Sequence, residues 1–470
     1  MFFWDHLEDY SDRIAVIGED NAHRTYSELI HTADKLIGTA GSRSVIFLQC
    51  ENSFASVAAY IGCLRHRVIP VMLNNSLPKE RFEELVRAYR PQYICCREDW
   101  YATGEVCAAA ENYHLLATGY PVVPVFPSLA VMITTSGSTG SAKFVMQSYE
   151  NVQCNTEQIV SYLNISENDR AITTLPMNYT YGLSIIQTHL SVGACIIATE
   201  STLMQRQFWE MLRNNKATTF GGVPYTYEML KKMRFARMEL PSLQYLTQAG
   251  GRLSKDLVLE FYEICRRKGT RFIVMYGQTE ATARMSYLPY SSLPDKAGSI
   301  GIAVPEGRFS LEDENGKPVT STDTTGELVY RGNNVTLGYA CSAADYDSGD
   351  SFGGVLHTGD LAKVDSDGYY YIVGRKKRFL KIYGNRVNLD EAENLLHEKG
   401  YDCACGGKDD QLCVYLVDPD PEVHKRLLHE MSELFSINHI AFKVIPVEEI
   451  PRNSAGKIQY SVLEARYGNK

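Results

Sequence analysis

The sequence predicts an α/β protein built around a largely parallel sheet that helices cover on both faces. Three observations support this prediction. Up to about Lys296, short apolar runs of strand length alternate with helical patterns of about ten to fifteen residues. Several of these runs end in glycine-rich turns, as at 134–143 and 249–251. Beyond Lys296 the pattern changes to short strands and turns, which indicates a β-rich region and then a small α+β domain.

A capped helix opens the alternation. We expect a helix over 25–36, because Thr25 or Ser27 can cap its start and apolar residues recur at helical spacing from Leu29 onward. The runs that follow predict strands at 45–48, 68–72 and 93–96, with helices at 53–64 and 79–89 between them.

The alternation continues through the middle of the chain. Apolar runs predict strands at 129–133, 169–174, 194–198, 218–220, 243–247 and 271–275, and helices at 151–163 and 181–190. Acid–glycine clusters at 326–330 and 365–368, next to alternating apolar residues, predict hairpins. A helix from about Val387 and a strand at 412–417 then predict the small domain.

Composition limits the classes of protein to consider. A chain of 470 residues predicts roughly two to four domains, and 44% hydrophobic with 22% charged residues is ordinary for a globular protein. The net charge of −9 argues against a nucleic-acid partner, which would require a basic surface. No run of about 18 apolar residues predicts a membrane span.

The N-terminus and the cysteines predict a cytoplasmic protein. The start, MFFWDHLEDY, carries acids where a signal peptide needs basic residues and a longer apolar core. The twelve cysteines are scattered without paired CxxC spacing, so we expect reduced and mostly buried thiols.

The segment 134–143, TTSGSTGSAK, is the strongest local signal. It follows the predicted strand at 129–133 and ends in Lys143. Glycines let the backbone approach a ligand closely, and exposed amides, hydroxyls and a lysine suit a phosphate. The alternative is a flexible Gly/Ser loop. The segment lacks the Gly-Lys-Ser/Thr of a Walker loop, so a different kind of phosphate binder is predicted.

Five separated segments, taken together, resemble one family. They are TTSGSTGSAK (134–143), YGQTEA (276–281), GELVYRG (326–332), HTGDL (357–361) continuing into DGYYYIVGRKKRFLKIYGNR (367–386), and PRNSAGK (451–457). In this order they resemble the acyl-adenylate-forming (AMP-binding) superfamily, which includes acyl-CoA synthetases, nonribosomal peptide adenylation domains and luciferases. Segments from most of the chain carry the resemblance.

The resemblance implies a fold and a division into domains. It implies two α/β sheet subdomains and a β-rich subdomain in a large N-terminal region, followed by a small mobile α+β domain. The ATP- and acid-binding domain would span 1–375 and the mobile lid 376–470. The hinge between them would lie at Lys377.

The reaction implied by the resemblance joins a carboxylic acid to ATP, which gives acyl-AMP and pyrophosphate. The acyl group then passes to a thiol, so ATP, Mg²⁺ and coenzyme A or phosphopantetheine are the implied cofactors. The leading hypothesis is an AMP-forming acid–CoA ligase. The alternative is a stand-alone enzyme that loads an acyl or peptidyl carrier protein. A non-catalytic nucleotide sensor is disfavoured because Lys457, Glu280 and Asp360 are all present.

Residue roles carry over from the matching motifs. Lys457 would bridge the carboxylate and the α-phosphate, Thr279 would contact the α-phosphate, and Glu280 would bind Mg²⁺. Nucleotide binding is implied for Thr135, Ser136, Gly137, Ser138, Thr139, Gly140 and Lys143 at the β,γ-phosphates, for Tyr276, Gly277, Gly250 and Gly251 around the adenine, and for Asp360 and Arg375 at the ribose. Gly384 would let the thiol arm pass.

The segment 175–184 aligns with the family's substrate-gating region, where Tyr179 occupies the position of a common histidine. Amino-acid-activating members carry an aspartate there, and no acid occurs between Leu175 and Leu190. Because a buried ammonium needs a counter-ion, we expect an acid without an α-amino group. The predicted pocket walls are Tyr179, Tyr181, Gly182, Tyr225, Ala281 and Met285. Two other positions depart from the family pattern: Ala142-Lys143-Phe144 replaces Pro-Lys-Gly, and Val274 replaces a polar adenine contact.

Overall fold

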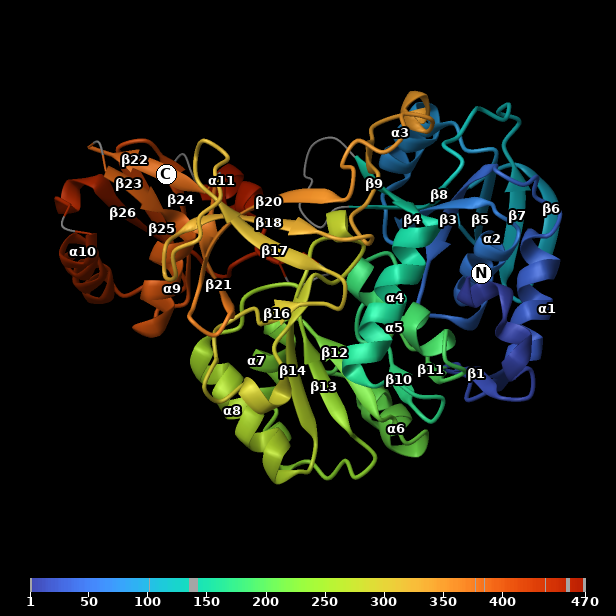
Figure 1. The fold of residues 1–470 in the computed structure, drawn as a ribbon, viewed down its shortest axis with the longest axis horizontal. Coiled ribbons are helices and arrows are strands. Elements are labelled where there is room, and N and C mark those ends of the chain that lie inside the picture. Colours follow the sequence, from blue (N-terminus) through green and yellow to red (C-terminus); the bar gives the residue numbers. More distant parts are fainter. Residues whose placement is uncertain are drawn as a thin grey trace. The chain divides into compact units, whose positions relative to one another are not determined.

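The computed structural model describes residues 2–100, 102–134, 143–376, 378–383, 385–435, 437–453 and 457–467. The chain divides into two compact units, which are described separately. The first comprises Met1–Ala297, Gly301–Arg308 and Arg331–Leu356. The second comprises Gly298–Ile300, Phe309–Tyr330 and His357–Lys470. The elements of both are labelled in Figure 1.

The first sheet of unit one has eight strands in the order β19-β9-β8-β4-β3-β5-β7-β6. Its central strands β8, β4, β3 and β5 are parallel, whereas the outer strands pair antiparallel. The central strands confirm the predicted runs, but the edge strands were not predicted. The bounds are β3 (Val45–Cys50), β4 (Ile69–Asn74), β5 (Tyr93–Arg97), β6 (Glu105–Ala110), β7 (Tyr113–Ala117), β8 (Leu129–Thr134), β9 (Phe144–Ser148) and β19 (Gly338–Ala340).

Three predicted helices pack around this sheet. They are α1 (Tyr26–Ile37), α2 (Phe54–Arg65) and α3 (Lys79–Tyr89). The predicted cap of α1 is confirmed, because the Thr25 hydroxyl accepts from the Glu28 amide while the Glu28 carboxylate accepts from the Thr25 amide. Fully buried α2 lies on one face of the sheet, and α3 packs Phe82 against Phe47 on the other.

The second sheet of unit one has nine strands in the order β16-β15-β14-β13-β12-β10-β11-β1-β2. Its centre, from β14 to β1, is parallel, and strands β10 to β14 confirm the predicted buried strands. The bounds are β1 (Ile14–Ile17), β2 (His23–Thr25), β10 (Arg170–Ile172), β11 (Cys195–Ile197), β12 (Thr219–Gly222), β13 (Tyr245–Gln248), β14 (Arg271–Tyr276), β15 (Ser286–Tyr287) and β16 (Ile302–Ala303).

Two predicted helices, α4 (Tyr149–Leu163) and α5 (Thr180–Leu190), lie between the two sheets. α4 contacts β8 and β9 of the first sheet, α5 contacts β10 and β11 of the second, and the two helices contact each other. Figure 1 shows this layer between the sheets. The outer face of the second sheet carries α7 (Pro224–Lys232) and α8 (Lys255–Arg267), and α6 (Arg206–Asn214) precedes β12.

The two sheets exchange strands. β1 and β2, from the start of the chain, pair at the edge of the second sheet next to β11. β19, which follows the second sheet in sequence, pairs with β9 of the first, with Tyr339 opposite Val145. Neither exchange was predicted, because each pairs strands that lie far apart in the sequence.

The second unit begins with the four-stranded sheet β17-β18-β20-β21. Its hairpin of β20 and β21 is confirmed, and the Asp365 carboxylate accepts from the amides of Asp367 and Tyr369 in the turn. The bounds are β17 (Arg308–Glu312), β18 (Gly326–Arg331), β20 (Val355–Val364) and β21 (Tyr370–Arg375).

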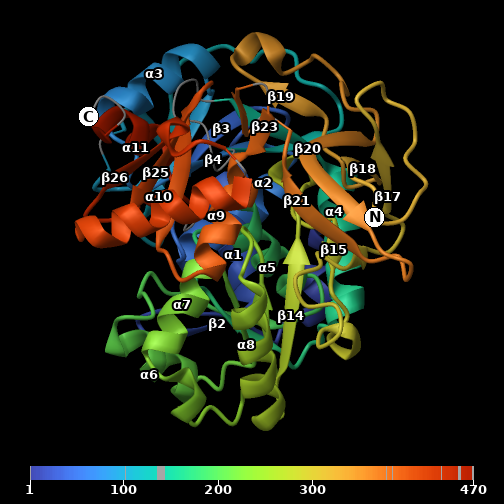
Figure 2. The same cartoon turned by 90° about the vertical axis from the view of Figure 1, so that its left-hand side faces the viewer.

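The rest of the second unit is the predicted small α+β part, shown in Figure 2 with α9 and α10 beside β24–β26. The three-stranded sheet β24-β25-β26 packs its core against α9 and α10. The bounds are β22 (Phe379–Ile382), β23 (Asn385–Asn388), α9 (Leu389–Glu398), β24 (Cys403–Lys408), β25 (Gln411–Leu416), α10 (Pro421–Phe435), β26 (Phe442–Pro446) and α11 (Tyr460–Tyr467).

Two predictions about the whole chain can be compared with the described residues. Among them, no helix is both long and apolar enough to cross a membrane. All twelve cysteines have unbonded thiols, and ten of these residues are buried, as predicted.

Candidate active site

Neighbouring parallel strands β13 and β14 end at the same edge of the second sheet, where Gln248 pairs with Val274. Ala249-Gly250-Gly251 follows β13, and the segment 277–285 follows β14. Ligands of α/β sheets bind at such carboxyl ends. The structure thus places two predicted adenine-side segments next to each other.

Close packing explains the glycines at this edge. Gly250 has φ +83°, and a Cβ there would lie 2.6 Å from the Tyr179 hydroxyl. A Cβ at Gly277 would collide with the carbonyl oxygen of Ala283. The side chain of Gln248 donates to the carbonyl of Gly251 at 2.9 Å. The backbone on both sides is therefore held at fixed positions.

The segment after Tyr276 contains a strained turn. Thr279–Ala281 forms one turn of 3₁₀-helix, and Thr282 follows with φ 63° and ψ −59°. The Ala283 amide donates to the Ala281 carbonyl at 2.7 Å, which makes Thr282 the centre of a positive-φ γ-turn. Such turns are rare and strained, and strain of this kind is retained where surrounding contacts enforce it.

Buried polar side chains enforce the turn. The Thr282 hydroxyl donates to the Asn334 carbonyl at 2.7 Å. The Asn334 side-chain amide donates in turn to the carbonyls of Ala281 and Arg284, at 3.0 and 2.8 Å. Gln147 of β9 donates to the Thr282 carbonyl. The turn is therefore fixed by Gln147 of the first sheet and by Asn334 of the segment between β18 and β19.

Glu280 and Lys143 contact the same tyrosine. The Tyr339 hydroxyl donates to Glu280 Oε1 at 2.7 Å, and Lys143 Nζ lies 3.7 Å from the centre of the Tyr339 ring. Burial, followed by the nearby Glu280 charge, raises the pKa of Tyr339, so the phenol keeps the proton that it donates. The predicted metal ligand and the predicted phosphate-binding lysine are thus brought together.

The surroundings of Glu280 fit Mg²⁺. Glu280 Oε1 accepts the Tyr339 bond, and within the described part of the chain no hydrogen bond is made to the other carboxylate oxygen. Among the described residues, no group of three or more His, Cys, Asp or Glu could form a protein cage for a metal. Mg²⁺ is commonly held by one or two carboxylates together with substrate phosphates and water. A single oriented carboxylate matches that donor set.

The predicted phosphate loop connects paired strands. Thr134, at the end of β8, pairs with Phe144, at the start of β9. This makes the segment the loop of an antiparallel hairpin. The predicted contacts of Thr135, Ser136, Gly137, Ser138, Thr139 and Gly140 lie outside the described residues, and they stay predictions.

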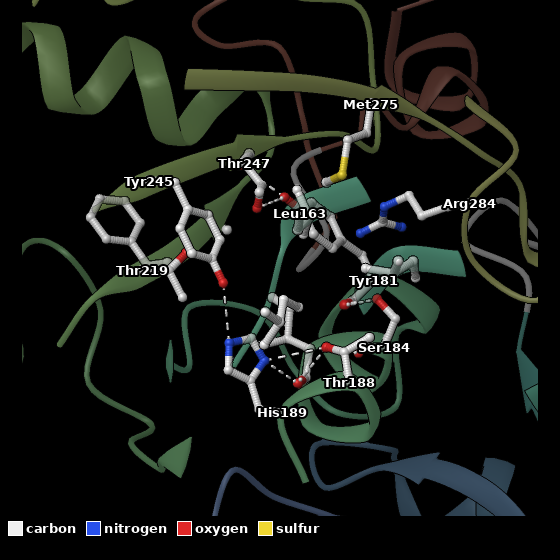
Figure 3. Close-up of a pocket in the computed structure, with 15 residues that line it drawn as sticks. Leu163, Tyr181, Ser184, Thr188, His189, Thr219, Tyr245, Thr247, Met275 and Arg284 are labelled. Atoms are coloured by element: carbon white, nitrogen blue, oxygen red, sulfur yellow. Dashed lines mark hydrogen bonds between the residues drawn. The ribbon is translucent and has the colours of Figure 1, made fainter. Parts of the chain in front are cut away.

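A small cavity lies behind this edge, between α4, α5 and the second sheet (Figure 3). We call it the acyl cavity because it is the candidate site for the acid. It has a volume of about 20 Å³, which is room for about one water molecule. Its lining combines aliphatic and polar side chains: Ile159, Leu163, Ile165, Tyr181, Ser184, Ile185, Thr188, His189, Thr219, Phe220, Gly221, Tyr245, Thr247, Met275 and Arg284.

Of the six predicted pocket residues, Tyr181 lines this cavity and the others do not. Its hydroxyl bonds to the carbonyl and the hydroxyl of Thr247, both at 2.8 Å. Tyr179 instead places its hydroxyl next to Gly250, and burial raises the pKa of Tyr179 to about 12. Gly182 packs tightly against Pro176, Ala281 and Met285 are fully buried, and Tyr225 is 45% exposed.

The second unit holds the predicted ribose pair on its paired strands. Asp360 of β20 lies opposite Arg375 of β21, with Arg375 Nε 3.3 Å from Asp360 Oδ1. Asp360 is buried, and its amide donates to the Thr358 hydroxyl. The two residues predicted to bind one sugar therefore already contact each other.

Lys457 of the second unit forms two hydrogen bonds with Asn453. Its amide donates to the Asn453 side chain at 3.0 Å, and its carbonyl accepts from the Asn453 amide at 2.9 Å. Arg452 and Ile458 pair beyond it. Asn453 and Lys457, two described residues of the last motif, thus bond to each other just before α11. Lys377 and Gly384 lie outside the described residues, so the hinge and the thiol-arm contact stay predictions.

Known proteins share this architecture and these motifs. The model of the family described as AMP-binding enzyme matches residues 3–340. The chain belongs to the AMP-binding enzymes. Among curated relatives of this AMP-binding enzyme, a probable CoA ligase of Humulus lupulus is 23% identical, over 98% of this chain and 94% of its own. A 2-succinylbenzoate–CoA ligase of Listeria innocua is 24% identical over 96% of both chains.

Solved structures agree on the fold. The o-succinylbenzoate CoA synthetase of Bacillus subtilis in complex with AMP has a TM-score of 0.81 at 20% identity, covering 99% of this chain and 98% of that one. The ATP-bound MatB of Rhodopseudomonas palustris has a TM-score of 0.80 at 22% identity, covering 99% of both. These likenesses place the AMP-binding enzyme in the same fold.

Sequence reasoning missed four residues of this AMP-binding enzyme that the structure places at the site: Tyr339, Asn334, Gln147 and Arg284. The first three act through tertiary contacts that span more than fifty residues, for which the sequence gives no local signal. Arg284 did leave a signal. It is a lone cation in a segment of small and apolar residues, three residues after the YGQTEA motif ends at Ala281.

Proposed function

We propose that this chain is an AMP-forming acid–CoA ligase. It would join a carboxylic acid to ATP, release pyrophosphate, and pass the acyl group from acyl-AMP to the thiol of coenzyme A. The observation that carries the proposal is the strained Thr279–Thr282 turn, which holds Glu280 beside Tyr339 and Lys143 in a chain of the AMP-binding family.

The first half-reaction brings two anions together, because a carboxylate must attack an α-phosphate. Fixed positive charge is the main remedy in such sites. Lys457 would bridge the carboxylate and the α-phosphate, Thr279 would hydrogen-bond the α-phosphate, and Lys143 with residues 135–140 would hold the β,γ-phosphates. Glu280 would hold Mg²⁺, which neutralises phosphate charge when it is bound.

The adenine would be held by packing against uncharged groups, and the ribose by one carboxylate. Tyr276 and Gly277 would lie on one side of the adenine, and the backbone of Gly250 and Gly251 on the other. Asp360 would accept hydrogen bonds from the ribose hydroxyls. Its contact with Arg375 supports that role, since the arginine holds the carboxylate in place.

The second half-reaction needs a thiol, and coenzyme A is the proposed donor. The thiol arm of coenzyme A would pass next to Gly384. A hinge at Lys377 would let 376–470 move against 1–375. Curated relatives that match nearly the whole chain are named CoA ligases, which supports coenzyme A over a carrier protein.

The proposed acid has no α-amino group. α5 and the turn before it contain no acid to pair an ammonium. The relatives' names cover oxalate, 2-succinylbenzoate and medium-chain fatty acids, so they leave the choice of acid to the pocket of this chain.

Pyrophosphate exchange tests the proposal. The full-length protein with Mg²⁺ and ATP should exchange labelled pyrophosphate only when a suitable carboxylic acid is present. Adding coenzyme A should then yield a thioester and AMP. A carrier protein bearing phosphopantetheine should give no faster transfer than coenzyme A. If no acid in a broad panel supports exchange, the proposal is wrong, and faster loading of the carrier would favour the alternative acceptor.

A further inference from the structure

The guanidinium of Arg284 is buried at the acyl cavity, with 3% of the residue exposed. Its Nη1 donates to the carbonyl oxygen of Ala283 at 3.1 Å, whereas its Nε has no hydrogen-bond partner. Its Cζ lies over the Tyr181 ring, 3.9 Å from the centre. Figure 3 shows the side chain pointing toward Tyr181, beneath Met275.

The described surroundings of Arg284 supply no negative charge. Among the described residues, it makes no ion pair with an Asp or Glu side chain. Burial raises the pKa of its neighbours Tyr162, Tyr179 and Tyr181, so their phenols are neutral. His189, across the cavity, is neutral because burial lowers its pKa.

An uncompensated buried charge requires an explanation. Arginine does not deprotonate in proteins, so it cannot escape the penalty as a buried lysine can. Removing an ion from water without a partner is strongly unfavourable. A protein retains such a group when a ligand brings the missing charge, and a guanidinium fits a carboxylate through two parallel hydrogen bonds.

Arg284 also lies close to the proposed reaction centre. The hydroxyls of Thr180 and Thr279 are 3.2 Å apart, and Thr279 is the proposed α-phosphate contact. Tyr181, the next residue after Thr180, lies beneath Arg284. Thr180 and Tyr181 are consecutive residues of α5, so the first turn of this helix contacts both Thr279 and Arg284.

We propose that the acid activated by this enzyme is a short dicarboxylic acid, whose second carboxylate binds Arg284 in the acyl cavity. The proposal rests on the proposed ligase function and adds the class of acid. The cavity volume of about 20 Å³ is smaller than a carboxylate, so its lining must move to admit the remote end of the acid, and a compact remote end requires the smallest movement.

Matched acids test the proposal by pyrophosphate exchange. The pairs are butanoate with butanedioate, pentanoate with pentanedioate, and benzoate with benzene-1,2-dicarboxylate. For at least one pair we expect the diacid to have a kcat/KM at least tenfold above the monoacid. If monoacids support exchange and no diacid exceeds its partner, this proposal fails while the ligase function stands. If no acid supports exchange, the ligase function itself fails.

Variants of Arg284 give the second test. R284Q should bring the diacid-to-monoacid ratio close to one, and R284K should keep part of the preference. R271Q is the matched control, because Arg271 also lies over a tyrosine ring, that of Tyr245, but does not line the cavity. The diacid-to-monoacid ratio of R271Q should stay at the wild-type value.

If R284Q is inactive, thermal unfolding can still test whether the diacid binds Arg284. The wild type and R271Q should gain several degrees in Tm with saturating diacid, and folded R284Q should gain none. A diacid preference or a diacid-induced shift that persists in R284Q would overturn the proposal.

Discussion

The nucleotide edge and the acyl cavity of the first unit are built in different ways. At the edge, a Gly-rich turn, a strained threonine and oriented hydrogen bonds position backbone and one carboxylate. The cavity is formed by side chains of two helices and three strands, with one buried cation among neutral groups. The residues proposed for the shared chemistry therefore lie in short motifs, whereas the residues proposed for selectivity come together only through packing.

This comparison makes Lys457→Ala the most damaging change. Loss of the proposed bridging charge should lower acid-dependent pyrophosphate exchange by about 10²- to 10³-fold, as for other transition-state donors. The loss should be equal for every acid, because the lysine would contact the reacting carboxylate, which all acids share. Transfer of preformed acyl-AMP to coenzyme A should be retained, and equal loss of both half-reactions would contradict the assigned role.

Tyr339→Phe tests whether the nucleotide edge acts independently of the acid. It removes the hydrogen bond to Glu280, and a bond to a charged group contributes about 1.5–3 kcal/mol. We expect kcat/KM at limiting Mg²⁺ to fall about tenfold, by the same factor for all acids. The measurement is a Mg²⁺ titration of exchange with two acids. A loss that depends on the acid would place Tyr339 with the cavity instead.

Two glycines offer a matched pair. A Cβ at Gly277 would meet the Ala283 carbonyl, and one at Gly182 would meet the Pro176 carbonyl. Each change to alanine should cost about 1–3 kcal/mol of unfolding free energy, as overpacking does. Gly277→Ala should slow exchange with all acids, whereas Gly182→Ala should change their relative rates. Gly41→Ala, near the Ser44 hydroxyl alone, is the control for stability.

The smallest expected effect is the pH dependence contributed by His189. Burial lowers the pKa of this cavity residue below 6.5, and its Nδ1 donates to the Ile185 carbonyl. The unfolded chain takes up a proton below pH 6.5 that the folded protein does not, so stability falls as pH drops. The slope should be at most about 1.4 kcal/mol per pH unit.

Denaturant unfolding between pH 8 and 5.5 measures this slope. His189→Gln should flatten the profile below pH 6.5, whatever its effect on absolute stability. A wild-type profile that matches the variant's would show that His189 is protonated inside the fold.

Sequence predicted the central strands and helices because buried parallel strands and capped helices leave periodic signals, as at α1 and β3. It also proposed segments for the nucleotide chemistry, and the structure brings Glu280 and Lys143 from two of them to the same tyrosine. It did not predict β9, and so did not show that the phosphate loop closes a hairpin. It also missed Asn334 and Tyr339, since partners distant in sequence leave no local pattern. The cavity was predicted least well: Tyr181 lines it, but the cation beside Tyr181 was overlooked.

The exchange of β1, β2 and β19 has a consequence for how the chain folds during synthesis. Each sheet of the first unit takes an edge strand from the far end of that unit's sequence. On the ribosome, β1 cannot pair with its neighbour until β11 has emerged. The first sheet stays incomplete until residue 340 has emerged. That position is also where the family match ends. Gene fragments cut between the sheets should therefore yield partners that need each other to fold.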